Sequence, residues 1–244
     1  MSKSVKVALV TGAGQRLGRE LALGLGRAGY ALAIHFRTNP QAAEETVDLL
    51  RKGGTDAAAF RADLADVRAC RTLFEETLSR FSRLDVLVHA ASPWITKPVA
   101  EVTVEDWDAT FDAGPRAAFF VAQAAAPALR SSSGAILFMS DVAAVKAWPF
   151  HVPHCAAKAA INSLAMNLAV ALGPEIRVNA IAPGVVLPPD SMSAESIQKL
   201  VAKTPLKRQV ALQDVVAMAV AILENRSMTG QVVFVDAGRS IKGD

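Results

Sequence analysis

The chain has 244 residues, of which 52% are hydrophobic and 20% are charged. That length suits one α/β domain, and the composition excludes a disordered, collagen-like or coiled-coil protein. The 26 basic and 23 acidic residues give a net charge of +3, and no run of basic residues stands out. Nucleic acid is therefore not an expected partner, because a surface that tracks a phosphate backbone needs clustered Lys and Arg.

The sequence predicts a protein of the reducing cytoplasm. No stretch reaches the ~18 consecutive apolar residues of a membrane span. The first residues lack the longer apolar region and cleavage site of a signal peptide. The two cysteines, Cys70 and Cys155, form no CxxC motif and no disulfide framework. We therefore expect neither a membrane partner nor an extracellular location.

Apolar runs of strand length alternate with segments of helical period along the whole chain. Nearly continuous apolar runs are typical of strands that are covered on both faces. The pattern therefore predicts a Rossmann-like, doubly wound, seven-stranded parallel sheet with helices on both faces, in a single domain over residues 1–244. The expected strands are 5–10, 30–36, 56–61, 85–89, 135–139, 177–181 and 231–235. The expected helices are 16–28, 40–52, 67–81, 104–130, 155–172 and 213–224.

Two segments depart from this regular pattern. Pro115 lies inside the long helix expected over 104–130 and predicts a kink there. Residues 183–206 contain no clear periodicity and follow a strand, so in such a fold they lie near the ligand-binding edge of the sheet. We interpret them as a substrate loop or lid.

The first strand is followed by the glycine-rich string TGAGQRLG, and a helix begins within it. A glycine-rich turn between a strand and a helix lets the backbone approach a pyrophosphate, which then binds the helix N-terminus. The position of the string, more than its letters, predicts a dinucleotide site.

The end of the second strand indicates which dinucleotide binds. An acidic residue there bonds the ribose 2′-hydroxyl of NAD. Residues 35–39 contain no acid, whereas Arg37, with Arg16 in the nearby turn, can pair with a 2′-phosphate. The sequence therefore predicts NADP(H).

Several short motifs together resemble the short-chain dehydrogenase/reductase family over essentially the whole chain. Within that family the chain is most similar to the pteridine and dihydromonapterin reductases. These have arginine in place of the middle glycine of the turn, as Arg16 stands here. They also have an aromatic residue where Trp94 stands and an aspartate where most members have a catalytic serine, as Asp141 stands here. The family motifs are the glycine turn, Asp63-Leu64, Asp85-Val86-Leu87-Val88, Lys158, Arg177-Val178-Asn179, Pro183-Gly184 and the ending 229–238.

The resemblance implies a role for each matching residue. Arg16 or Arg37 is expected to bind the 2′-phosphate and Lys158 the nicotinamide ribose. Trp94 is expected to stack on a flat substrate, and Arg16 to contact that substrate as well. The remaining cofactor-binding residues are Gly12, Arg16, Leu17 and Gly18 at the pyrophosphate, Asp63 and Leu64 at the adenine, and Pro183 and Gly184 beside the nicotinamide.

The residues that perform the family's chemistry are the ones that differ. The family places a tyrosine four residues before its lysine, and this chain has His154 there, before Lys158. Asp141 stands 13 residues before His154, where the catalytic serine is usual, and Gly114 replaces an asparagine. The chain's one tyrosine, Tyr30, lies in the second strand and cannot substitute.

Several kinds of chemistry remain open for this set. His154 can protonate a substrate as hydride arrives if Asp141 favours its charged form more than Lys158 opposes it. Asp141 can itself supply the proton, directly or through water. The favoured hypothesis is an NADPH-dependent reductase of a pterin-like heterocycle or another small carbonyl or imine. The alternatives are a non-redox isomerase or dehydratase that uses the Asp141/His154 pair, and an NADP-binding protein without turnover.

Other titratable residues are expected to be structural. His151 and His154 have metal-ligand spacing, but Pro153 argues against one continuous helical turn between them, and we predict no metal. Cys155 is expected to be packed and not to act as a nucleophile, and His35 to be a structural residue of the second strand. Because members of this family commonly pair long helices between subunits, we expect a homodimer or homotetramer.

Overall fold

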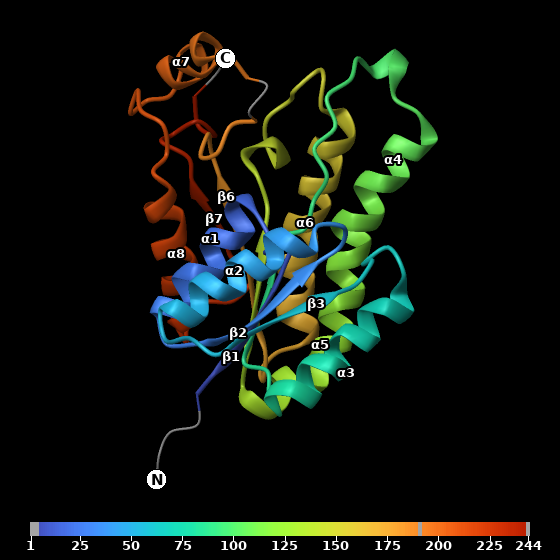
Figure 1. The fold of residues 1–244 in the computed structure, drawn as a ribbon. Helices are drawn as coiled ribbons and strands as arrows, with labels where there is room; N and C mark the ends of the chain where they lie inside the picture. The colour runs from blue at the N-terminus through green and yellow to red at the C-terminus, as the bar shows by residue number, and fades with distance from the viewer. Residues whose placement is uncertain (1–4, 190–191, 243–244) are drawn as a thin grey trace.

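In the computed structural model, which describes residues 5–189 and 192–242, one parallel sheet forms the centre of the molecule (Figure 1). Its strand order is β3-β2-β1-β4-β5-β6-β7, so the order reverses between β1 and β4. Ligands of open α/β sheets bind at the carboxyl edge of such a reversal. The strands are β1 (Val7–Thr11), β2 (Ala31–Phe36), β3 (Ala57–Arg61), β4 (Val86–His89), β5 (Ala135–Met139), β6 (Arg177–Pro183) and β7 (Val232–Val235).

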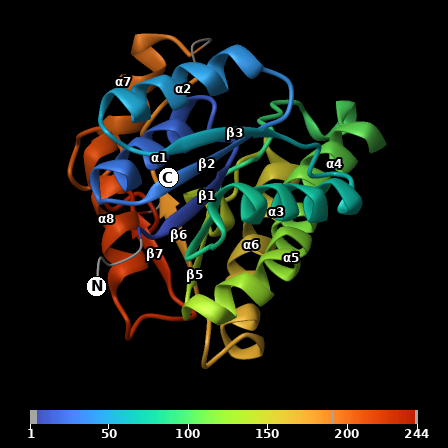
Figure 2. The same cartoon turned by 60° about the horizontal axis from the view of Figure 1, so that its bottom comes forward.

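Helices cover both faces of this sheet, as Figures 1 and 2 show. On one face α1 packs against α2 and α8, and on the other α3 packs against α5 while α4 packs against α6. The helices are α1 (Arg16–Arg27), α2 (Pro40–Lys52), α3 (Val67–Phe81), α4 (Val104–Phe111), α5 (Ala117–Ser132), α6 (Val152–Ala171), α7 (Ala194–Ala202) and α8 (Leu212–Glu224). None of the helices described is long and apolar enough to cross a bilayer.

The two hydrophobic cores lie on opposite faces of the sheet. Strand β1 shows why, since its side chains point alternately to each side and all five residues are buried. Leu9 packs in the core beneath α3, α5 and α6, whereas Val10 packs in the core beneath α1, α2 and α8. The predicted doubly wound, seven-stranded fold is therefore confirmed, with the apolar strand runs serving both cores.

The long helix predicted over 104–130 is interrupted where its proline predicted. A π-helical segment, η2 (Asp112–Arg116), separates α4 from α5, and Gly114 within it has non-helical angles of φ −92° and ψ −112°. Pro115 has no N–H to donate, so the regular hydrogen-bond ladder cannot continue through it. Gly114 consequently lies at the bend.

One other expectation about helices is wrong, and one helix was not predicted. Helix α6 begins at Val152 rather than at residue 155, with His151 as its N-cap. Pro153 sits in the first turn, where no N–H is needed, so it starts the helix instead of interrupting it. In the aperiodic segment 183–206 the structure contains α7, capped by the Ser193 side chain, which accepts the Ser196 N–H at 3.2 Å. This helix has no fully buried residue, although Ile197, Leu200 and Val201 follow helical spacing and are partly buried, so the sequence carried a short helical signal that the prediction missed.

Candidate functional site

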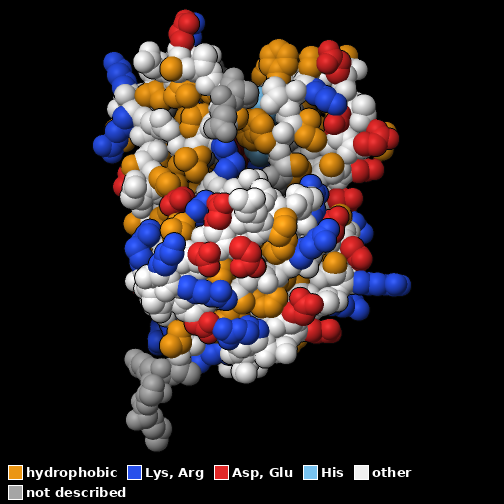
Figure 3. Space-filling view, in the orientation of Figure 1, with side chains coloured by type: hydrophobic (Ala, Val, Ile, Leu, Met, Phe, Trp, Pro, Cys, Tyr) orange, Lys and Arg blue, Asp and Glu red, His pale blue; other side chains and the backbone are white. Residues whose placement is uncertain are grey.

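A cleft of about 970 Å³ opens at the carboxyl edge of the sheet. Figure 3 shows it as a hollow near the top of the molecule, with histidine atoms inside and hydrophobic side chains on both rims. All the residues predicted to bind cofactor or substrate or to move a proton line this one cleft. Their roles stay predictions, but the structure brings them together.

The glycine-rich turn forms one wall and leaves a helix N-terminus open. Gly12 has a positive φ of +66°, and its N–H donates to His35 Nδ1 at 3.1 Å. A Cβ on Gly18 would lie 2.3 Å from the Gly12 carbonyl oxygen, so only glycine allows this close turn. Gln15 caps α1 without a side-chain hydrogen bond. The first N–H groups of α1 are thus available to a phosphate, and the site fits a dinucleotide.

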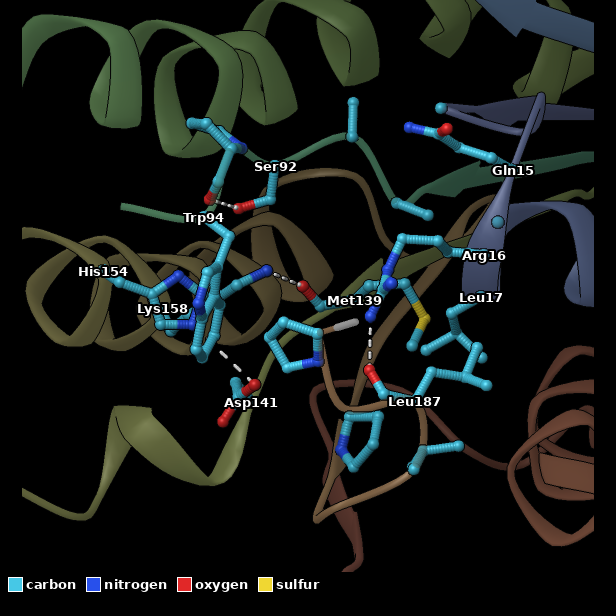
Figure 4. A pocket seen from close by; sticks show the side chains of 18 of the residues that line it. Gln15, Arg16, Leu17, Ser92, Trp94, Met139, Asp141, His154, Lys158 and Leu187 are labelled. Atoms are coloured by element: carbon cyan, nitrogen blue, oxygen red, sulfur yellow. Dashed lines mark hydrogen bonds and ion pairs between the residues drawn. The ribbon is translucent and has the colours of Figure 1, made fainter. Parts of the chain in front are cut away.

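Arg16 connects this turn to the segment that follows β6. Its guanidinium donates to the Leu187 carbonyl oxygen, as the dashed line in Figure 4 marks, and lies 3.4 Å from the Pro188 oxygen. Arg16 therefore lies between the predicted cofactor site and the predicted substrate loop. Arg37 is exposed at the end of β2 and faces the same cleft.

Hydrogen bonds hold the residues that are predicted to contact the adenine and the nicotinamide. Asp63 Oδ1 accepts the Ala65 N–H at 3.1 Å, and Leu64 beside it is buried. At the other end Gly184 donates its N–H to the Val235 oxygen at 3.0 Å. A Cβ on Gly184 would lie 2.8 Å from Asp236 Cα, so a larger residue would move the chain beside Pro183.

His154 lines the cleft and is buried within it. It is only 4% exposed, and neither ring nitrogen has a hydrogen-bond partner in the described part of the chain. Its Nε2 lies 3.7 Å from Asp141 Oδ2, which is too long for a hydrogen bond but within the distance of an ion pair. Asp141 is itself held, because its Oδ1 accepts the Ala143 N–H at 2.8 Å.

Lys158 lies beside His154, one helical turn further along α6 (Figure 4). It is buried, and its Nζ donates to the Met139 oxygen at 2.7 Å. Burial lowers the pKa of Lys158 to about 8, although the Asp141 carboxylate opposes the shift. The cation that the family's lysine supplies is consequently present at neutral pH and lost in mild alkali.

Aromatic rings surround His154 on its exposed side. The Trp94 ring lies 4.7 Å from the His154 ring, centre to centre, and 4.8 Å from that of His151. The Trp148 ring is nearly parallel to His154, at 6.5 Å and 7°. Since Trp94 remains 45% exposed, it is partly free to contact a ligand. His151 is anchored to Thr96, whose Oγ1 lies 3.0 Å from His151 Nε2.

Sequence reasoning missed His89, which lies beneath the bend in the long helix. The ring is buried and its Nδ1 lies 3.0 Å from Thr11 Oγ1. Burial lowers the pKa of His89 to about 3, and the carbonyls of Ala113 and Gly114 oppose the shift only weakly. A neutral His89 thus lies between β1 and the segment where the family has its asparagine. Nothing in the spacing of the sequence indicated this contact.

The remaining candidates fill other parts of the structure. His35 bridges the first turn to β3, with Nε2 3.1 Å from the Ala62 oxygen, and burial lowers its pKa to about 4. Burial raises the pKa of Cys155, so its thiol stays protonated at neutral pH. Among the residues that the structure describes, no cluster of His, Cys, Asp or Glu could hold a metal ion.

Comparison with known proteins identifies relatives along the full chain. Residues 12–240 match the protein family described as enoyl-(acyl carrier protein) reductase. The chain is 37% identical to the hydroxynaphthalene reductase-like protein Arp2 of Metarhizium anisopliae, over 96% of this chain and 94% of that protein. It is 36% identical to versicolorin reductase 1 of Aspergillus parasiticus, over 74% of this chain and 70% of that protein.

One solved structure with a similar fold contains a bound cofactor. FolM alternative dihydrofolate reductase 1 from Brucella canis, complexed with NADP, superimposes with a TM-score of 0.92. The match covers 99% of this chain and 96% of that one at 28% sequence identity.

Proposed function

The chain belongs to the short-chain dehydrogenase/reductase family, and from that premise we propose that it reduces a small flat substrate through a site in which His154 replaces the family's tyrosine. It is an oxidoreductase of the NADPH-dependent reductase type. The observation that carries the proposal is the state of His154, which is buried in the cleft with both ring nitrogens unpartnered among the described residues. A buried polar group without a partner is costly, so a ligand atom is its expected partner.

NADP(H) fits the cofactor side of the cleft. The open N-terminus of α1 suits the pyrophosphate, and the exposed Arg37 suits the 2′-phosphate. Lys158 is proposed to hold the nicotinamide ribose, and Asp63 and Leu64 the adenine. The FolM structure with NADP, which shares the fold, supports this arrangement. Hydride transfer is the chemistry that this cofactor supplies when bound.

His154 is proposed to deliver the proton that must accompany the hydride. A carbonyl or imine that accepts hydride at carbon needs a proton on oxygen or nitrogen, and the imidazolium releases one from a ring nitrogen. Asp141, 3.7 Å away, stabilises the charged ring before the transfer. Solvent then restores the proton. His154 thus acts as the general acid and Asp141 as its electrostatic support.

Trp94 is proposed to position the substrate by stacking. Its exposed ring stands beside His154 and lines the cleft, so a flat heterocycle against it would place its reacting bond near the imidazole. A pterin is one such heterocycle, and the similarity to the FolM reductase supports it. Segment 183–206, of which residues 190 and 191 lie outside the described part, is proposed to close over the substrate with α7. Arg16, which donates to the Leu187 oxygen, is proposed to contact the substrate as well as the cofactor. A homodimer or homotetramer also stays a prediction, which light scattering tests.

The Asp141/His154 pair also suits a second candidate, because a carboxylate beside an imidazole can act as a base for an isomerase or dehydratase. NADPH oxidation with oxidised and dihydro pterins separates these functions. We expect turnover in the wild type, at least a hundred-fold loss in His154→Ala and a smaller loss in Asp141→Asn. Turnover by His154→Tyr alone would show that the natural chain performs different chemistry or none on these compounds. Unchanged turnover in His154→Ala would refute the assigned acid.

A further inference from the structure

The C-terminal turn after β7 presents one arginine to the substrate side of the cleft. Asp236 is buried, and its carboxylate accepts the Gly238 N–H at 2.9 Å and the Ser240 N–H at 2.6 Å. The Arg239 N–H donates to the Asp236 carbonyl oxygen at 3.1 Å. These bonds fix the backbone on both sides of Arg239, whose side chain lines the cleft. The backbone that carries Arg239 is therefore held in a hydrogen-bonded turn.

A tryptophan holds the Arg239 guanidinium without neutralising it. The guanidinium carbon lies 5.2 Å from the centre of the Trp148 ring, which is a cation–π distance. Trp148 in turn lies beside His154 and Trp94. The cation is consequently placed on the aromatic side of the cleft, where the reacting part of a substrate is proposed to lie.

All but one of the charged side chains that line the cleft already have a proposed partner. Arg16, Arg37, Asp63 and Lys158 are assigned to the cofactor, with Arg16 also expected to contact the substrate, and Asp141 faces His154. Arg239 is the lining cation left over, and it forms no ion pair within residues 5–189 and 192–242. A partly buried guanidinium that is stacked on an indole and lacks a carboxylate is prepared for an anionic ligand.

We propose that Arg239 recognises a carboxylate on the substrate and so makes the enzyme selective for acidic aromatic compounds. The inference rests on the proposed substrate site, since it names the chemical class that this site takes. The aromatic ring of the substrate would lie against Trp94 and Trp148, with its reacting bond at His154 and its carboxylate at Arg239. A guanidinium binds a carboxylate through two parallel hydrogen bonds, which selects the group by geometry as well as by charge.

A binding experiment tests this without any turnover. Isothermal titration calorimetry of the protein saturated with NADP⁺ compares 2-naphthoate with 2-naphthamide, which share a flat ring and differ in the charged group. We expect the wild type to bind the acid about ten-fold more tightly than the amide, as a charge-assisted pair requires. In Arg239→Gln the acid and the amide should bind with about equal affinity, while the affinity for NADP⁺ stays the same.

Two further variants control the result. Lys242→Gln removes an equal charge three residues away, outside the cleft lining, and should keep the full preference. Arg239→Lys keeps the charge but loses the planar fork, so an intermediate preference is expected. The thermal midpoint of each variant verifies folding.

The proposal is overturned if the wild type fails to prefer the acid, which includes binding neither probe, or if the preference survives in Arg239→Gln. It is also overturned if Arg239→Gln weakens NADP⁺ binding as much as naphthoate binding, because Arg239 would then serve the cofactor. Acid selectivity without NADPH oxidation would leave the Arg239 assignment intact and refute only the proposed reductase chemistry.

Discussion

Protonation of His35 should destabilise the fold in mild acid. The ring lies at the end of β2, where Nδ1 accepts the Gly12 N–H and Nε2 faces the Ala62 oxygen, each at 3.1 Å. One nitrogen must accept and the other donate, so the neutral ring satisfies both contacts and the charged ring breaks the first. Burial accordingly lowers the pKa of His35 to about 4, and the Ala62 carbonyl only partly opposes the shift.

The magnitude follows from proton linkage. The unfolded chain takes up a proton near pH 6.5, and the folded chain only near pH 4, so between these values the unfolded state holds more protons. Stability therefore falls as the pH falls through this window. From pH 7 to pH 5, His35 should lower the free energy of unfolding by about 2 kcal/mol. His89, whose pKa burial lowers to about 3, should add about the same loss.

Urea unfolding at pH 7, 6 and 5 measures the effect in the wild type and in His35→Asn. Asparagine does not titrate, so the variant should be less stable at pH 7 yet lose about 2 kcal/mol less than the wild type on acidification. His151→Asn removes a histidine that is not fully buried, so its smaller pKa shift should change the pH dependence less. Parallel pH dependences in the wild type and His35→Asn would refute the inference that His35 stays neutral in the folded protein.

Three other perturbations follow from the contacts. Gly18→Ala should lower the free energy of unfolding by at least about 2 kcal/mol and abolish NADPH binding, because its Cβ would meet the Gly12 oxygen at 2.3 Å. Gly114→Ala is the control, because the nearest atom to its Cβ would be 3.8 Å away, and it should cost under about 1 kcal/mol. Urea unfolding measures the stability of both variants, and titration with NADPH measures binding. The Kd for NADPH should rise about ten-fold from pH 7 to pH 9 as Lys158, with its pKa of about 8, loses its charge, and Lys158→Met should remove that rise. Asp85→Asn should cost about 2 to 3 kcal/mol by urea unfolding, because the buried carboxylate accepts the Val7 N–H and pairs with an arginine.

The parts of the fold that the sequence predicted are those with a buried face. Strands such as β1 and β5 are buried along their whole length, so their apolar runs appear in the sequence. The kink in the long helix was predictable because Pro115 lacks the N–H that the helix needs. Helix α7 was missed although its Ser193 cap and its apolar residues at helical spacing are visible in the sequence, because it is only nine residues long and none of them is fully buried.

The cofactor part of the candidate site was also easier to predict from the sequence than the substrate part. The predicted pyrophosphate site is built by backbone geometry in one continuous turn, and glycines mark that geometry in the sequence. The substrate half is built by side chains from segments far apart in the chain, such as Trp94, Trp148 and Arg239. Their proximity depends on how β4, β5 and β7 end at one edge of the sheet, and no local spacing encodes it. His89 was missed for this reason too.

In the proposed site, the two residues that differ from most of the family, His154 for tyrosine and Asp141 for serine, suit each other chemically. A phenol needs a nearby cation to release its proton, whereas an imidazolium releases one near neutrality without that help. The imidazolium instead benefits from an anion, and Asp141 stands 3.7 Å from His154 where the family has a neutral serine. If His154 depends on the Asp141 carboxylate, Asp141→Ser should impair the wild type and matter less in His154→Tyr. A double-mutant cycle on NADPH oxidation measures that coupling, and additive effects would contradict it.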